Sequence, residues 1–529
     1  MTRLVASAAL VLMAAGFSAC GGEPAQIIDY APQRASVDVS TATPVNITFD
    51  HDVDRASVES RLHLMPPTNG EVHWASGHQL VYQHATLRTN TTYEVILEAG
   101  YKDVAGNTYT LRHHWSFVTE AAPTFTGSTP ANADTGIDPA AYLVLSFSRQ
   151  MDAAALASAI TLTPAAPFEV RGDPSDSRKV IVAPSQLLDP NTTYTVAIST
   201  GAVDVDGNQI DRFQTIAFKT GPPRPLHGWI TFTTIGVDGS PGGLWIVNET
   251  GFPRLLFNTT PVHAFSWSPE GGSVLVQGDG EAWWLLSPGG EGSQLGFKGT
   301  WAAALAAGMG YVYIDDARIL HRVSADGADT QVAINVKEAS VSARGERVLF
   351  IDSQSSHTIW GYDVGLRATF LLGSDSGTVS DAVWAPSGNR IAYLRRDSSG
   401  VNVRIRNLVG SAATSTAVSG DIQDIAWLSD STHMVVGVTL AGPQGQMHKA
   451  FVINALLPPP TLTAQAALPA VPAVDVSSPN PSPDGHQIAF LNGDQVWLMN
   501  ADGTRPTALT KLDPESFPYS CQALAWTRS

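Results

Sequence analysis

The sequence predicts an all-β protein, and its composition and turn pattern carry this expectation. Charged residues make up 15% of the 529-residue chain, below the roughly 25% of ordinary soluble domains. Glycine (46) and proline (34) are frequent, and Val, Ile and Thr recur in short runs between turn residues, as in proteins built from many short strands. We expect little helix beyond the N-terminal apolar run and one short turn within Asp152–Ile160. The length allows three or four domains.

The net charge of −17 at pH 7 limits the classes of partner. An acidic surface repels phosphate backbones, so we expect no nucleic-acid binding. The same charge disfavours a polybasic attachment to anionic lipids. The two cysteines, Cys20 and Cys521, build no disulfide framework and no cysteine metal site.

The N-terminus predicts export. Arg3 precedes an apolar run from Leu4 to Phe17, which is of signal-peptide length and short for a membrane span. Ser18, Ala19 and Cys20 follow. This resembles the lipobox of bacterial lipoproteins, although Phe17 stands where that family usually has Leu. The resemblance implies a signal peptide over residues 1–19, lipidation of Cys20 and a tether over 20–26. The alternative is an ordinary secretory signal with a coincidental cysteine.

A repeat of about a hundred residues follows. Its landmarks include the strands Val45–Phe49 and Leu143–Phe147 and the turns Asp103–Asn107 and Asp204–Asn208. The strands alternate apolar and polar residues, as expected when one face is buried. The landmarks resemble the SbsA-type bacterial Ig-like domain. That resemblance implies two Ig-like β-sandwiches, over residues 27–120 and 123–220, of a kind that acts as a spacer or surface scaffold.

A second repeat begins after the Pro-rich linker at 221–225. An apolar anchor precedes a turn and an apolar strand, at spacings mostly of propeller-blade length. The anchors are Trp267, Val341, Trp384, Trp427 and Pro481, with a degenerate copy near Ala304–Tyr313. The last copy, Ser482–Gly485 through Asp502–Gly503, resembles the WD40-like repeat of the TolB propeller family. The resemblance implies a TolB-like β-propeller over residues 226–529.

The two ends of this region predict how the ring closes. The chain ends on an anchor strand, Leu524–Trp526, with no blade after it, and begins on a second strand, Trp229–Phe232, with no anchor before it. Both are therefore expected in one blade, which removes two open sheet edges. Six anchors plus the shared blade favour seven blades, with six as the alternative. The Pro-rich insertion from Leu457 to Pro472 is expected to be a surface loop.

No catalytic or metal signature of useful specificity occurs, and we expect no cofactor and no metal. The weaker features each have a plain structural explanation. Asp204 and Asp206 faintly suggest a calcium loop, but a simple turn is favoured. Cys521 is expected to be a small buried residue. Seven histidines fall in the first sandwich: His51, His63, His73, His78, His84, His113 and His114. The adjacent pair His113 and His114 should point to opposite faces, which argues against joint ligation.

The sequence thus predicts a cell-envelope lipoprotein that binds rather than catalyses. The lipid holds it to a membrane, the sandwiches form a stalk, and the propeller docks a protein or glycan. In a two-membrane envelope the site is the outer membrane or periplasm, and otherwise the outer face of the cytoplasmic membrane. The alternatives are a purely structural envelope protein, or a propeller hydrolase or lyase with its site in the central channel. For that enzyme, His263, His321 and Asp381 lie near blade edges.

Overall fold

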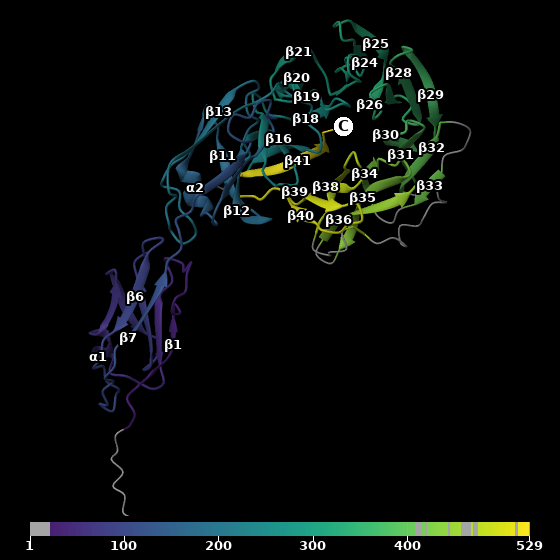
Figure 1. Ribbon diagram of the computed structural model, residues 1–529. Helices are drawn as coiled ribbons and strands as arrows, with labels where there is room; N and C mark the ends of the chain where they lie inside the picture. The colour runs from purple at the N-terminus through teal and green to yellow at the C-terminus, as the bar shows by residue number, and fades with distance from the viewer. Residues whose placement is uncertain are drawn as a thin grey trace, which may run out of the picture.

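The computed structural model describes residues 22–398, 400–408, 414–417, 421–442, 445–455, 467–468, 474–513 and 517–527. Two sandwiches and a seven-bladed ring follow one another along the described chain (Figure 1). This confirms the predicted fold class. Cys20 and most of the Leu457–Pro472 insertion lie outside the described residues.

The first sandwich packs a four-stranded sheet on a three-stranded sheet. The larger sheet has the order β1 (Ile27–Ala31), β2 (Val45–Phe49), β5 (Gln79–His84), β4 (Gly70–Trp74). The smaller sheet has the order β3 (Leu62–Met65), β6 (Thr92–Leu97), β7 (His113–Val118), and helix α1 (Arg55–Glu59) precedes β3. Alternation in β2 buries Val45, Ile47 and Phe49 in the shared core.

The second sandwich repeats this plan. Its larger sheet has the order β11 (Phe168–Asp173), β12 (Asp176–Pro184), β9 (Leu143–Phe147), β8 (Phe125–Thr129). Its smaller sheet has the order β10 (Ile160–Thr163), β13 (Thr193–Ile198), β14 (Gln214–Lys219). The predicted short helical turn is α2 (Ala153–Ala159), which begins there because the Asp152 carboxylate accepts the N–H groups of Ala154 and Ala155.

The described part of the remaining chain forms seven antiparallel sheets arranged as propeller blades. Blade 2 contains β18 (Ala264–Trp267), β19 (Val274–Gln277), β20 (Ala282–Leu286) and β21 (Gly292–Lys298). Blade 3 contains β22 (Trp301–Ala304), β23 (Tyr311–Ile314), β24 (Leu320–Val323) and β25 (Asp329–Ala333). Blade 4 contains β26 (Val336–Val341), β27 (Arg347–Asp352), β28 (Thr358–Asp363) and β29 (Ala368–Ser374). The 3-10 helix η1 (Asp279–Glu281) joins β19 to β20.

Blades 5 to 7 continue the ring. Blade 5 contains β30 (Thr378–Trp384), β31 (Arg390–Asp397), β32 (Gly400–Asn407) and β33 (Thr414–Ala417). Blade 6 contains β34 (Asp421–Trp427), β35 (His433–Gly442) and β36 (Gly445–Asn454). Blade 7 contains β37 (Ser477–Pro481), β38 (Gln487–Asn492), β39 (Gln495–Asn500) and β40 (Thr507–Ala508). Apolar side chains pack between neighbouring blades, as where Val312 and Leu320 of blade 3 meet Val348 and Phe350 of blade 4.

The first blade contains both ends of the ring. It has the order β17 (Arg254–Phe257), β16 (Pro241–Val247), β15 (Ile230–Gly236), β41 (Tyr519–Trp526). The register pairs Ile230 with Trp526 and Phe232 with Leu524, so the final strand is the inner strand of the blade that the chain began. The shared blade predicted from the two ends of the sequence is confirmed.

The second sandwich is fastened to the side of the propeller through a buried arginine. The Arg254 guanidinium donates to the carbonyls of Ala140 (2.8 Å) and Ala141 (3.3 Å) and stacks on the Tyr142 and Trp229 rings at 4.2 and 5.5 Å. Burial lowers the pKa of Arg254 to about 10, which still leaves it charged at neutral pH. The second sandwich and the propeller therefore form one packed unit.

Candidate functional site

The inner strands of the propeller surround a central channel with two chemically different ends. All seven inner strands contribute to a cavity of about 630 Å³, whose walls are mostly alanine, proline and tryptophan side chains. The Ser-Pro-Asp-Gly-type turns lie at this end, and the second sandwich docks on the same side: the Leu226 N–H donates to Gly271 O in one such turn. The opposite end of the channel consequently faces away from the sandwiches.

Three carboxylates from consecutive blades lie at that opposite end. Glu338 of β26, Asp381 of β30 and Asp424 of β34 line one cavity of about 320 Å³. Each stands three residues before the last residue of its inner strand, Val341, Trp384 or Trp427. The repeat therefore places them at equivalent positions in their blades.

Bulges in the inner strands shape this end. The strand register shifts between Val336 and Glu338, between Ser380 and Val383, and between Ile422 and Asp424. Asp381 adopts a left-handed backbone (φ 52°), and its N–H donates to Glu338 Oε1 at 2.9 Å. Bulges of this kind redirect side chains next to functional sites.

The surroundings of Glu338 and Asp424 favour either the protonated form of these carboxyl groups or a cation bound next to them. Burial raises the pKa of Glu338; the charge of Lys337 opposes this increase, and the charge of Asp381 adds to it. Burial likewise raises the pKa of Asp424, again assisted by Asp381. An adjoining cavity of about 580 Å³ carries further acidic lining from Asp421 and includes His448, whose Nδ1 lies 2.9 Å from Asp475 Oδ2. A cation bound here would relieve the mutual repulsion of the carboxylates.

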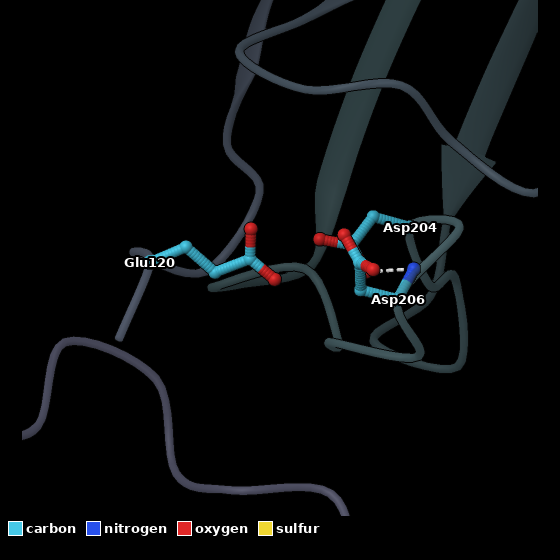
Figure 2. Close-up of side chains that lie close together, drawn as sticks. All are labelled: Glu120, Asp204 and Asp206. Atoms are coloured by element: carbon cyan, nitrogen blue, oxygen red, sulfur yellow. Dashed lines mark hydrogen bonds between the residues drawn. The ribbon is translucent and has the colours of Figure 1, made fainter. Parts of the chain in front are cut away.

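A second acidic cluster lies between the two sandwiches (Figure 2). Among the described residues, only Glu120, Asp204 and Asp206 bring three metal-type ligand atoms within 4.8 Å of one another. Figure 2 shows Glu120 reaching from the interdomain segment toward the turn that carries both aspartates, where the Asp206 N–H donates to Asp204 Oδ1 at 3.1 Å. Oxygen ligands of this kind suit Ca²⁺.

The cluster is already compensated by protein groups. Arg149 Nη1 donates to Glu120 Oε2 at 2.6 Å, and Asn208 Nδ2 donates to Glu120 Oε1 at 2.7 Å. Ser40 Oγ donates to Asp206 Oδ1 at 2.6 Å from the first sandwich. Burial raises the pKa of Glu120, and the hydrogen bonds from the Thr41 N–H and from Asn208 oppose that increase. The geometry identifies the cluster as the polar joint between the sandwiches, and Asp204 Oδ1 accepts the N–H groups of Asp206 and Asn208 within its turn.

The histidines noted in the sequence are distributed rather than gathered. His113 stacks on Tyr109 (4.6 Å), whereas His114 Nδ1 lies 2.9 Å from Glu94 Oε1, so the adjacent pair does face opposite ways. His321 Nδ1 lies 3.0 Å from Asp329 Oδ1, and His263 Nε2 lies 2.8 Å from Asp279 Oδ1. Neither His263 nor His321 lines the channel cavities, whereas Asp381 does.

Cys521 is a buried residue of the closing strand, as predicted. Burial raises the pKa of its thiol to about 11, and Thr510 Oγ1 lies 3.6 Å from Sγ. Within the part of the chain that the structure describes, no helix is long and apolar enough to cross a membrane.

Comparison with known proteins agrees with this architecture. Residues 22–119 and 120–220 match the bacterial Ig-like domain family. The chain therefore carries two consecutive bacterial Ig-like domains. No curated protein sequence matches the chain.

Three solved structures show a low overall similarity to the chain. TolB from Acinetobacter baumannii is 14% identical, with a TM-score of 0.38 over 70% of this chain and 83% of that one. A putative TolB from Agrobacterium tumefaciens is 13% identical, with a TM-score of 0.32 over 53% and 88%. Kuenenia stuttgartiensis hydrazine synthase is 12% identical, with a TM-score of 0.37 over 45% and 76%.

Proposed function

We propose that this protein is a lipid-anchored binding protein of the bacterial cell envelope. The signal-like segment at residues 1–19 and the lipobox-like Ser18-Ala19-Cys20 support export and lipidation. Two or more acyl chains provide a stable anchor where a single chain does not. Intact-mass analysis of the protein from membranes tests this step: a mass lacking residues 1–19 and carrying a diacylglyceryl group is expected, and an unmodified N-terminus contradicts it.

The propeller is the binding module in this proposal. The observation that carries it is the set of carboxylates at one repeat position, Glu338, Asp381 and Asp424, beside a cavity on the side away from the Ig-like domains. Three acidic groups around one channel end complement a partner with clustered positive charge. We therefore favour a basic segment of an envelope protein over a neutral glycan.

Affinity capture from solubilised envelope tests this proposal. The full chain is compared with the variant Glu338→Gln/Asp381→Asn/Asp424→Asn, which removes the charge and preserves side-chain size. The matched control is Glu249→Gln/Glu291→Gln/Asp326→Asn, which removes the same charge from turns at the other end of the blades. A partner held by the wild type and the control but lost by the channel variant supports the proposal. Equal capture by all three refutes the site, and capture of nothing favours a structural role.

One observation favours a second candidate, a propeller hydrolase acting on glycans. Two carboxylates with raised pKa values, Glu338 and Asp424 on the blades either side of Asp381, have the character of general acids. We rank this below binding because no catalytic signature in the sequence supports it. Release of reducing sugar from envelope polysaccharide by the wild type, abolished by Glu338→Gln, would reverse the ranking.

A further inference from the structure

The two Ig-like domains correspond residue by residue at the end where the chain enters each of them. The family match begins at Gly22 in one copy and at Glu120 in the other. Ile27 pairs with Phe49, as Phe125 pairs with Phe147. Gly22 therefore occupies in the first domain the place that Glu120 occupies in the second.

The second domain has this end covered. The turn Asp204–Asn208 meets the first domain through Ser40, Thr41 and Glu120, as described above, and Thr41 Oγ1 donates to Asn208 Oδ1 at 2.6 Å. The equivalent turn of the first domain is Asp103–Asn107, and no other domain of the described chain packs against it. Figure 1 shows this end at the far tip of the molecule, away from the second domain and the propeller.

The uncovered end carries three exposed apolar side chains. Ile28, Val104 and Leu111 are 64%, 70% and 66% exposed. The segments that carry Ile28 and Val104 are joined through residues 50–52, because the Val104 N–H donates to Asp52 O and the Asp50 N–H donates to Gln26 O. The corresponding residues of the second domain are Thr126, Val205 and Arg212, of which Val205 remains 56% exposed, and Phe213 beside Arg212 is 57% exposed. Exposed apolar side chains grouped at one end indicate a contact surface.

The chain length defines what lies against this surface. A β-carbon on Gly22 would lie 3.2 Å from Asn107 Nδ2, so the entering chain lies against the exposed turn. Gly21 alone separates Gly22 from Cys20, and two residues of extended chain span roughly 7 Å. If Cys20 is lipidated, as proposed above and as this inference requires, the membrane surface lies within that reach of the domain.

We propose that this end of the first Ig-like domain is a membrane-contacting surface, with Ile28, Val104 and Leu111 inserted among the lipid headgroups. The nearby charges permit this contact. Lys102 and Arg112 flank the apolar residues in sequence, and Arg112 Nε lies 3.4 Å from Glu98 Oε1. Among the carboxylates near the turn, Asp50 and Asp103 lie within ion-pair distance of His51, and Asp52 lies within ion-pair distance of His78.

Such a contact sets the orientation of the whole molecule. A lipid on a flexible tether alone would let the stalk lie at any angle, whereas a seated domain end holds the stalk upright. The first and second domains are joined by the Glu120 network and the second domain is packed on the propeller, so the channel end with the three carboxylates is carried away from the membrane.

A fluorophore at equivalent turn positions tests the contact. NBD is attached to Val104→Cys or, as the matched control, to Val205→Cys, each in the full-length protein with Cys521→Ser. The proteins are reconstituted in vesicles of phosphatidylethanolamine and phosphatidylglycerol (3:1), after intact mass confirms the lipid on Cys20. We expect a blue shift of NBD emission and quenching by headgroup-region doxyl lipid at position 104, and neither at position 205.

The possible results distinguish the membrane contact of the first Ig-like domain from the lipid anchor on Cys20. A lipidated, vesicle-bound protein whose two positions behave alike overturns the membrane contact and leaves the anchor intact. A protein without the lipid mass that does not float with vesicles overturns the anchor and the contact with it. Adding Ile28→Ser/Leu111→Ser to the position-104 protein should abolish the blue shift while vesicle binding through the lipid persists.

Discussion

Trp526→Ala is the substitution that tests how the ring is closed. Trp526 is the last apolar residue of β41, is 7% exposed, and packs among Ile230 and Phe232 of the partner strand. Its indole N–H donates to Asn480 O at 2.9 Å in the neighbouring blade. The side chain thus joins the first and last blades of the propeller.

The expected loss follows from its burial. Truncating a buried tryptophan to alanine costs about 3–5 kcal/mol through lost transfer free energy and a residual cavity. Leaving the Asn480 carbonyl without its donor adds about 1 kcal/mol. For a unit of this size we expect the melting temperature of the propeller to fall by on the order of 10 °C.

The matched control is Trp427→Ala, because Trp427 has the same 7% exposure in the inner strand of blade 6, away from the closure. Calorimetric unfolding of both variants is the assay. If the ring is continuous, the two substitutions lower the melting temperature by similar amounts. If Trp526→Ala costs less than about 1 kcal/mol while Trp427→Ala costs several, β41 is not a working part of the first blade and the reasoning is wrong.

Three further results are expected. Arg254→Lys should destabilise the packed unit by about 2–4 kcal/mol in denaturant unfolding. Lysine lacks the planar guanidinium group that donates to two carbonyls and stacks on two aromatic rings. A change below about 0.5 kcal/mol would contradict the packing of the second Ig-like domain on the propeller through Arg254. The pKa of Glu338 is raised in the folded state, so the folded state binds the proton of this group more tightly than the unfolded state does. The contribution of Glu338 to folding stability therefore increases as the pH falls through the raised pKa toward the ordinary pKa of glutamate. The stability of the wild type relative to Glu338→Gln should therefore be greater at pH 5 than at pH 7.5, and a pH-independent difference would show that the group is not perturbed. Cys521, with a pKa near 11, should react with a disulfide reagent at pH 8 roughly 100-fold more slowly than a free thiol, and Trp526→Ala should accelerate that reaction.

The ring closure could be predicted from sequence because the information is local and repeated. Leu524–Trp526 reproduces the anchor pattern without a following blade, and Trp229–Phe232 reproduces a second strand without a preceding anchor. Only one pairing satisfies both. The strands Val45–Phe49 and Leu143–Phe147 were predictable for a similar reason, since a period of two with one buried face leaves little freedom of register.

The attachment of the second Ig-like domain to the propeller could not be predicted. The proline-rich segment at 221–225 reads as a spacer between independent domains, yet Leu226 is buried and the Gly221 N–H donates to Ile137 O. Arg254 reads as a surface charge, because no periodicity marks an arginine whose partners are carbonyls more than a hundred residues earlier.

The acidic end of the channel was partly predictable from the sequence. Asp381 alone was noted in the sequence, as one of several charges near blade edges. Aligning the anchors would have placed Glu338 and Asp424 at the same offset as Asp381. The raised pKa values could not have been found this way, because they depend on burial and on the bulges that turn the carboxylates toward one cavity.

The most direct test of the central claim is the affinity of the captured partner for the full-length protein as a function of salt. The account predicts that the dissociation constant rises with ionic strength for the wild type. It also predicts that Glu338→Gln/Asp381→Asn/Asp424→Asn weakens binding by at least about tenfold at low salt, the equivalent of about 1.4 kcal/mol, and flattens the salt dependence. An unchanged affinity and salt dependence in this variant would show that the propeller does not bind its partner through the acidic end of the channel.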